Sequence, residues 1–233
     1  MSKSLAVLLS ATLVCSATPT LACSPASEYR VPTNLELAGE AEVIVLGQVV
    51  AGTPMGEAAM HEASIRVRPV AVLKGKLPGE PIVLDGMMLA DERYAVLSNP
   101  YELAEAHPVT YVGGCIRFAF PAGTQALFFL TQRDGNWGPA GGPFSRWAED
   151  VLDPKAPWPV LAALYARAAA LPEGERTTLL ETERAALLKK DDDPVARLMA
   201  ADITRQLAGP NAPLRGPLPD EDDPAEEHSE PQP

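Results

Sequence analysis

The abundance of proline is the sequence feature that most restricts the fold. The chain has 233 residues, with 24 Pro against 17 Gly. Proline fixes φ and lacks an N–H group, so this usage favours turns, strand ends and short elements over one long helical bundle. The apolar share of 46% and the charged share of 21% are close to those of ordinary globular proteins. These values argue against a wholly disordered, collagen-like or polytopic membrane protein.

The net charge is the second restriction, because it bears on the class of partner. The formal charge at pH 7 is −12, and no basic stretch stands out along the chain. Binding to nucleic acid needs a basic face that contacts phosphates. We therefore expect no nucleic-acid partner.

Residues 1–22 have the order of regions found in a secretory signal peptide. Lys3 precedes the apolar run Leu5–Val14, and Thr20–Ala22 has the small-residue character of a cleavage site. This run is too short to cross a bilayer, and no later one reaches the roughly 18 to 20 apolar residues needed. We predict a secreted or periplasmic protein without a transmembrane segment, whose mature chain begins at Cys23. The alternative is a lipoprotein signal, which would attach a lipid anchor to Cys23.

Export leaves two cysteines in an oxidising compartment. Cys15 is removed with the signal peptide, so Cys23 and Cys115 remain, and a disulfide is the default expectation. An acylated Cys23 would instead leave Cys115 as a free thiol. Two cysteines cannot form a structural zinc site, and we expect no metal or cofactor of the protein's own.

Short apolar runs predict a mainly β fold with an α appendage. Before them, Asn34 is a candidate N-cap for a short helix over residues 35–42. The first strand is apolar on both faces, as in a strand covered by a barrel core on one side and a helix on the other. Five short strands with bends predict a small closed barrel of the OB type. The five strands are expected at residues 43–50, 63–73, 81–84, 115–120 and 124–131.

The rest of the chain divides into an insertion, a helical region and a tail. Residues 86–114 are too long for a hairpin loop and are expected to carry helical pieces near 91–97 and 101–106. Such excursions often carry binding surfaces. Residues 149–209 show helical periodicity in three short segments, the last capped by Asp191–Asp193 before Pro194. Residues 210–233 form a Pro-rich acidic tail with too little apolar surface to order itself.

Several weak motifs gain specificity from their order along residues 23–133. They are Cys23 followed by Pro25, the strand Val45–Val49, the run Val72–Gly75, Cys115, and the strand Gly123–Leu130. In this order they resemble the netrin-like module, which is the OB-fold domain of the tissue inhibitors of metalloproteinases and of their bacterial relatives. The resemblance implies a netrin-like domain over residues 23–148, with the insertion 86–114 inside it.

The resemblance also implies a disulfide and a binding surface. It pairs Cys23 with Cys115. In the inhibitors, the amine and carbonyl of the first cysteine bind the zinc of a protease, and the next side chain enters the specificity pocket. Here these groups are the Cys23 main chain and the Ser24 hydroxyl, with Pro25 beside them, and zinc accepts such N and O ligands. The sequence departs from the family at Pro25, where the animal inhibitors have a second Cys, and at Ile116, where they usually have Gly.

Residues for catalysis are scarce, and we predict no catalytic site. The folded regions contain two histidines, His61 and His107, while His228 lies in the tail. A metal site of His61, Glu62 and His107 has suitable ligand types, but adjacent strand residues point to opposite faces. The sequence has no Gly-x-Ser-x-Gly elbow and no phosphate-binding glycine loop.

Two acidic pairs and the tryptophans have simpler explanations than chemistry. The pairs Asp91–Glu92 and Glu102/Glu105 are expected on solvated helix faces. The tryptophans are Trp137, Trp147 and Trp158, which we expect to bury against the core or to seal a junction between parts of the chain.

Binding is therefore the predicted role. One hypothesis is an exported protein-binding module resembling the metalloproteinase inhibitors, with a zinc metalloprotease as partner. The alternative is an envelope structural or ligand-binding protein or lipoprotein without inhibitory activity, which binds a glycan or a protein. In that case the barrel face or residues 86–114 would make the contact, and Cys23 would be irrelevant to it.

Overall fold

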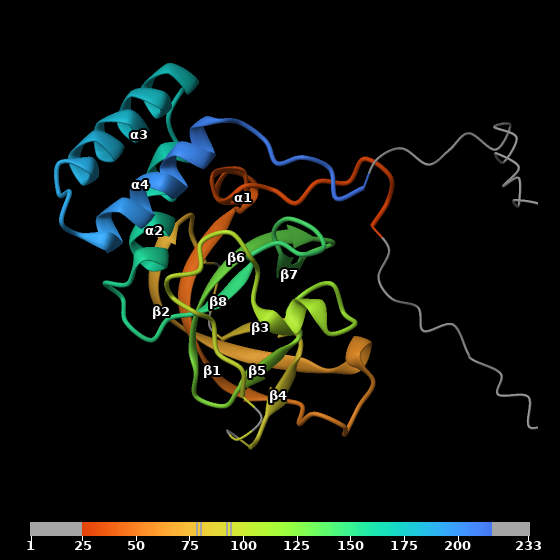
Figure 1. Cartoon of the computed structure of the whole chain (residues 1–233). Helices are drawn as coiled ribbons and strands as arrows, with labels where there is room; N and C mark the ends of the chain where they lie inside the picture. Colours follow the sequence, from red (N-terminus) through yellow and green to blue (C-terminus); the bar gives the residue numbers. More distant parts are fainter. Residues whose placement is uncertain (1–24, 78, 80, 92, 94, 216–233) are drawn as a thin grey trace, which may run out of the picture.

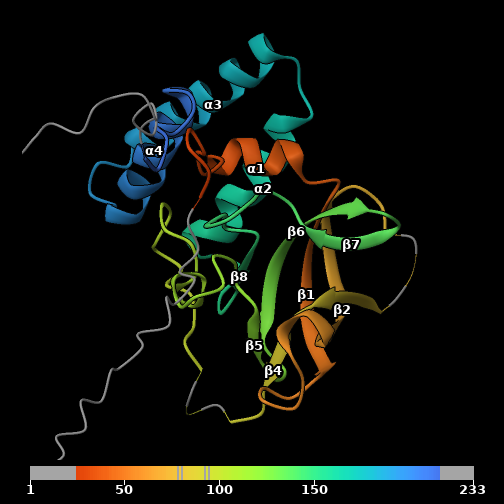
Figure 2. The same ribbon diagram turned by 90° about the vertical axis from the view of Figure 1, so that its right-hand side faces the viewer.

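The protein combines one large β-sheet with a group of helices that lies to one side of it (Figures 1 and 2). The structure is a computed structural model that describes residues 25–215, except residues 78, 80, 92 and 94. The predicted signal peptide, Cys23, Ser24 and residues 216–233 lie outside the described residues. What the sequence predicts for them stays a prediction.

The main sheet has six strands, and its pairings are antiparallel. Five follow the order β3-β2-β1-β6-β7, and β8 also pairs with β6. In a separate two-stranded sheet, β4 (Met87–Leu89) runs parallel to β5 (Ala119–Pro121). The strands of the main sheet are β1 (Val43–Gly52), β2 (Ser64–Lys74), β3 (Ile82–Asp85), β6 (Gln125–Arg133), β7 (Asn136–Pro139) and β8 (Ala148–Asp150).

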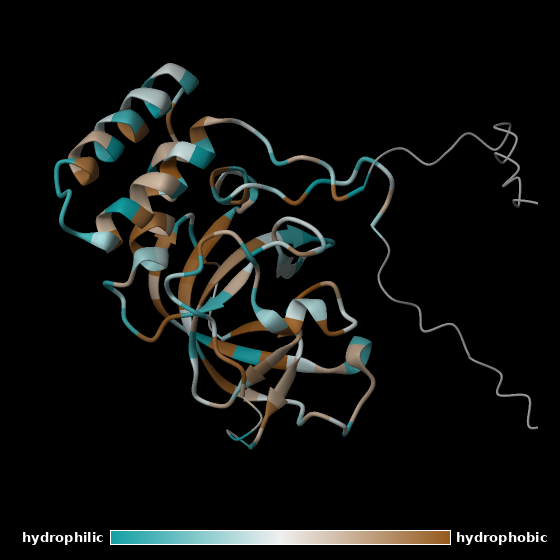
Figure 3. Cartoon of the chain, in the orientation of Figure 1, coloured by the Kyte–Doolittle hydropathy of each residue, from teal (hydrophilic) through white to brown (hydrophobic). Residues whose placement is uncertain are grey.

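The central pair β1 and β6 separates two hydrophobic cores, because both strands are apolar on both faces. Val43 and Val45 of β1 face a core with Phe128 of β6, whereas Ile44 and Phe129 face the helices. Figure 3 shows these strands as largely hydrophobic. The prediction that the first strand is covered on both sides is confirmed.

The predicted five-stranded closed barrel is not what the structure contains. The sheet is open and the fold is mixed α/β. Strands β3 and β7 come near each other, but no hydrogen-bonded ladder joins them within the described residues. The expected strand 115–120 also differs, because Cys115 has a positive φ of 54° and the chain becomes extended only at Ala119. Short strands β7 and β8, which the sequence did not predict, pair with β6 instead.

The helices form as their caps and periodicity predict. The expected three C-terminal helices are α2 (Pro157–Ala169), α3 (Glu173–Leu188) and α4 (Pro194–Leu207), and they follow α1 (Asn34–Glu40). Asp193 caps α4 by accepting the Val195 and Ala196 N–H groups, with Pro194 in the first turn. The cap of α1 is Thr33 and not Asn34. Thr33 and Glu36 form a reciprocal capping box that frees the Asn34 side chain for other contacts.

The tryptophans confirm their predicted structural role in two cases. Trp147 packs against Phe120 and Phe128 between the strands. Trp158 of α2 packs against Phe129 of β6 at the junction of the helices with the sheet. Both indoles are buried. Trp158 belongs to the core between the helices and the sheet, whereas Trp147 belongs to the core on the other side of the sheet.

The excursion 86–114 contains little regular structure. Besides β4 it carries the short 3-10 helix η3 (Pro108–Tyr111), and the expected helix over 101–106 is absent, since those described residues form turns and bends. Its contacts with β8 hold it against the sheet. The Ser98 N–H donates to Asp150, and the His107 N–H donates to Glu149.

The two ends of the described chain lie side by side (Figure 1). The Leu214 N–H donates to the Tyr29 carbonyl over 2.9 Å, and the Asn211 side chain donates to the Val31 carbonyl over 2.9 Å. The first residues of the predicted tail are thus held against the segment that precedes α1.

We predict that Phe128→Ala lowers the free energy of unfolding by about 3–5 kcal/mol, because the ring is fully buried between Phe120 and Trp147 and truncation leaves a cavity. Urea unfolding followed by circular dichroism measures this loss. The matched control is Val83→Ala on β3, where the side chain is 52% exposed and the change should stay within about 0.5 kcal/mol. Equal losses for both variants would contradict the assigned core.

Candidate functional site

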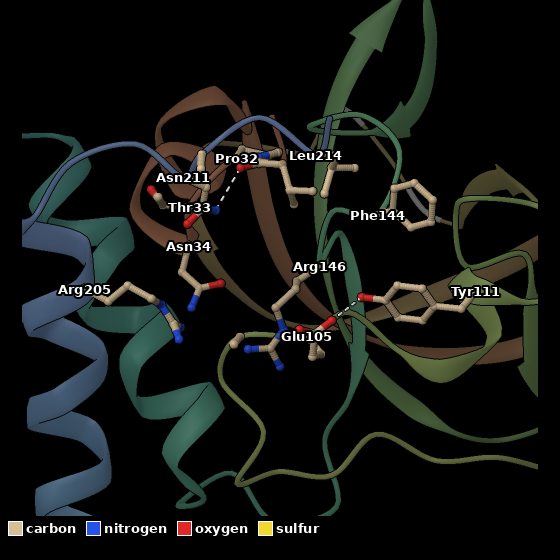
Figure 4. A pocket seen from close by; sticks show the side chains of 13 residues that line it. Pro32, Thr33, Asn34, Glu105, Tyr111, Phe144, Arg146, Arg205, Asn211 and Leu214 are labelled. Carbon is tan, nitrogen blue, oxygen red and sulfur yellow. Dashed lines mark hydrogen bonds between the residues drawn. The ribbon is translucent and has the colours of Figure 1, made fainter. Parts of the chain in front are cut away.

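A cavity of about 460 Å³ lies where the two chain ends, the excursion and the segment before β8 meet (Figure 4). This volume is in the range of small-molecule sites. Its lining is apolar on one side, with polar and charged groups on the other. The lining residues are Val31, Pro32, Thr33, Asn34, Ala104, Glu105, Tyr111, Phe144, Arg146, Arg205, Asn211, Ala212 and Leu214.

The start of α1 forms one wall of the cavity, and hydrogen bonds fix it to α4 and to the excursion. The Asn34 Nδ2 donates to the Leu103 carbonyl over 2.8 Å, and the Leu35 N–H donates to the Gln206 side chain over 3.0 Å. Asp202 of α4 accepts hydrogen bonds from Arg205 and from the Tyr165 hydroxyl. Burial, then the Asp202 charge, raises the pKa of Tyr165, so this phenol remains a donor.

Tyr111 and Glu105 form the opposite wall. The Tyr111 hydroxyl donates to Glu105 Oε2 over 2.6 Å, and the Tyr111 ring stacks on Phe144 with centroids 5.5 Å apart. Burial and the hydrogen bond to the Glu105 carboxylate raise the pKa of Tyr111 to about 12. The phenol therefore stays protonated at neutral pH, and Glu105 keeps its donor.

Two non-glycine residues with positive φ shape the edge of the cavity. Phe144 has φ 59° and Cys115 has φ 54°, and the Phe144 N–H donates to the Cys115 carbonyl over 2.6 Å. Such backbone conformations are unfavourable for bulky residues and persist where the surroundings enforce them. Here the conformation of Phe144 places its ring against Tyr111 on the cavity wall.

Arg146 is the charged group at the base of the site. Its side chain is 3% exposed, and the guanidinium lies over the Trp158 ring, 3.9 Å from the centroid. The Glu149 Oε1 lies 3.7 Å from the Arg146 Nε, beyond hydrogen-bonding distance. Burial lowers the pKa of Arg146, while the charges of Glu149, Asp202 and Glu102 oppose that shift.

A buried ionic network beneath the site anchors the excursion to β8. The Arg117 Nη2 donates to Asp150 Oδ1 over 2.8 Å, and both side chains are within 1% of complete burial. The His107 Nε2 lies 3.3 Å from Asp150 Oδ2. Burial alone would raise the pKa of Asp150, but His107, Arg117 and the Ser98 N–H outweigh it and hold that pKa well below the ordinary value.

Both ring nitrogen atoms of His107 are in hydrogen-bond contact with the backbone. The Nδ1 atom accepts the Val109 N–H over 3.1 Å, so a neutral ring carries its proton on Nε2, which lies 2.9 Å from the Val96 carbonyl. Ser98, which lies nearby in the network, donates its hydroxyl to Glu149 Oε2 over 2.6 Å. These groups therefore cross-link the chain, and neither nitrogen of His107 is available as a base toward Ser98.

The three residues that the sequence suggested as a possible metal site lie apart in the structure. His61 and Glu62 lie on an exposed short helix, η1 (Met60–Glu62), whereas His107 is buried beside Asp150. Among the described residues, no group of three or more His, Cys, Asp or Glu side chains is arranged to hold a metal ion.

The acidic pairs differ in their surroundings. Asp91 pairs with Arg93 at the surface. Glu102 and Glu105 do not lie on a helix, as the sequence predicted, but line a second cavity of about 410 Å³ that shares Glu105 and Tyr111 with the first. Burial would raise the pKa of Glu102, but the Glu105 and Ala104 N–H groups and Arg146 lower it below the ordinary value.

Sequence reasoning did not find Phe144, Arg146 or Arg205. These residues come from the segment before β8 and from α4, far from the expected binding surfaces, and the turn at residues 138–143 carries no motif. The one available signal was an arginine, Arg146, directly before Trp147, a tryptophan expected to be buried. A charge in such a position needs a buried counterpart or a ligand.

Comparison of the chain with models of protein families, with curated proteins and with solved structures gives no match. The netrin-like resemblance therefore remains a prediction. In the part of the chain that the structure describes, no helix is both long and apolar enough to cross a membrane.

We predict that Asp150→Asn lowers the free energy of unfolding by about 3–5 kcal/mol at pH 7, because it leaves Arg117 buried without a counter-charge. The folded-state pKa of Asp150 is depressed. Its stabilisation is therefore complete above the unfolded value of about 3.9 and is lost as the pH falls through the folded value.

Urea unfolding of the wild type and the variant across the acid range tests this prediction. The difference between them should narrow below about pH 4. Asp134→Asn, at an exposed turn position that tolerates Asn, is the control and should change stability little. A difference for Asp150→Asn that is independent of pH would contradict the ionic role.

Proposed function

We propose that the protein is an exported binding protein whose ligand occupies the cavity between the excursion and the two chain ends. The observation that carries this proposal is the construction of the cavity. Segments that are 69 to 180 residues apart in the sequence meet there and are held by hydrogen bonds, as between Asn34 and Leu103 or Asn211 and Val31. A preformed, largely apolar cavity with a few oriented polar groups is the usual form of a ligand site.

The surrounding contacts favour binding over catalysis. His107 and Ser98 are consumed by contacts that cross-link the chain, and Tyr111 has a pKa of about 12 that keeps its proton in place. The excursion supplies Glu105 and Tyr111 to the wall of the cavity, which agrees with the alternative hypothesis drawn from the sequence.

We predict that the protein binds Nile red, a neutral apolar dye, and that Ala104→Trp weakens this binding roughly tenfold or more. Ala104 is exposed at the cavity, so an indole there fills the space without disturbing the core. Dye fluorescence measures the dissociation constant. The control is Ala201→Trp, at an exposed position of α4 that does not line the cavity. Equal affinities of the two variants would contradict binding at this site.

A second candidate is the inhibitor-like wedge at the N-terminus, and one contact supports it. The Tyr29 hydroxyl donates to the Pro143 carbonyl over 2.7 Å, next to Phe144, whose N–H bonds to the Cys115 carbonyl. The described chain therefore enters close to Cys115.

We predict that peptide mapping of the natively purified protein without reductant gives a peptide that links Cys23 to Cys115, with an unmodified N-terminal amine. The wedge requires both features, and such a protein should then inhibit at least one member of a panel of zinc metalloproteases. Extension of the mature N-terminus by one alanine is the control, because it displaces the amine and should abolish inhibition. A diacylglyceryl group on Cys23 would exclude the wedge.

A further inference from the structure

Arg146 has hydrogen-bonding capacity that the described protein does not use. Its Nε and Nη1 atoms are buried and have no hydrogen-bond partner. Only 3% of the side chain is exposed, yet it lines the cavity. Unpaired buried donors are rare in folded proteins, because they lose their hydrogen bonds to water without replacement.

The three carboxylates whose charges act on Arg146 already accept hydrogen bonds from other donors. Glu102 Oε1 accepts the Ala104 and Glu105 N–H groups. Glu149 accepts the Ser98 hydroxyl on one oxygen and the His107 N–H on the other. Asp202 accepts Tyr165 and Arg205. The negative charges of these acids partly offset the charge of Arg146, and the Trp158 ring lies against the guanidinium. The free N–H groups therefore need an acceptor that arrives from elsewhere.

The cavity has the charge pattern that suits an anionic acceptor. Two of its lining residues are cationic, Arg146 and Arg205, and its single acidic lining residue, Glu105, is already engaged by the Tyr111 hydroxyl. Figure 4 shows Arg146 below the apolar part of the cavity, with Phe144 and Leu214 above it. A ligand with a charged end and an apolar body would match both parts.

We propose that the cavity binds a small organic carboxylate with an apolar body, whose carboxylate accepts hydrogen bonds from Arg146. This inference rests on the proposed ligand-binding function and gives that function its ligand class. An unpaired N–H of the guanidinium can donate to a carboxylate oxygen, and such charge-assisted bonds are among the strongest available. The apolar body lies along Phe144 and Leu214.

The test compares three ligands of equal chain length that differ in the head group: octanoate, octanol and octylammonium. Isothermal titration calorimetry on the full-length mature protein measures each affinity, and displacement of Nile red reports occupancy of the cavity. Octanoate should bind roughly ten- to hundredfold more tightly than octanol, and octylammonium should bind most weakly.

Variants assign this selectivity to Arg146. Arg146→Gln should reduce the affinity for octanoate to about that for octanol, while Arg146→Lys should retain part of the difference. Arg167→Gln is the matched control, because this arginine is 66% exposed on α2 and does not line the cavity. The comparison of head groups in the wild type needs no variant, so it remains decisive if Arg146→Gln fails to fold.

The outcomes separate this inference from the proposed function. If Nile red binds but octanoate and octanol compete equally, the cavity binds ligands and the role of Arg146 is overturned. A preference for octylammonium overturns it as well. If neither Nile red nor any of the three ligands binds, both proposals are overturned.

Discussion

The buried carboxylate of Asp150 is the contact on which the arrangement of the site depends. It pairs with Arg117, accepts the Ser98 N–H and lies 3.3 Å from His107. It therefore joins β8 to two points of the excursion, Ser98 and His107. A charge at this depth is tolerated only because each oxygen has donors. The excursion has little regular structure of its own. This network fixes where Glu105 and Tyr111 stand, and it therefore fixes one wall of the cavity.

The opposite side of the cavity depends on the helices. The indole of Trp158 contacts Phe129 of the sheet and the guanidinium of Arg146. The junction of the helices with the sheet therefore also positions Arg146. Arg146 lines the cavity, and two of its buried nitrogen atoms have no hydrogen-bond partner among the described residues. Asp202 then ties α4 to α2 through Tyr165 and to α1 through Asn34, at 3.4 Å. Arg146 thus takes part both in packing and in the proposed binding. Substitutions of Arg146 therefore need affinities for a series of ligands as a readout besides stability.

The sequence predicted three elements well where the local signal was strong. The double-sided apolar pattern of residues 43–50, the Asp193 cap before Pro194 and the periodicity of the three C-terminal helices each became the expected element. It failed where pairing is non-local. The run at 115–120 has strand-like composition, yet the positive φ of Cys115 and the parallel pairing of Ala119–Pro121 with β4 place it outside the main sheet. Closure of the sheet depends on such pairings between distant strands, which composition does not encode.

By itself, the sequence determined the elements with the clearest periodicity, which are β1 and the three C-terminal helices. It also determined that two cysteines follow the predicted signal and that the chain is acidic without a basic stretch. These properties follow from local periodicity, spacing and charge, which each segment carries alone. Only the tertiary structure decided that Asn34, Tyr111, Arg146 and Leu214 surround one cavity. The reason is physical: folding buries Arg146 beside a cavity and leaves two of its nitrogen atoms without a hydrogen-bond partner. That outcome depends on neighbours from separate parts of the chain.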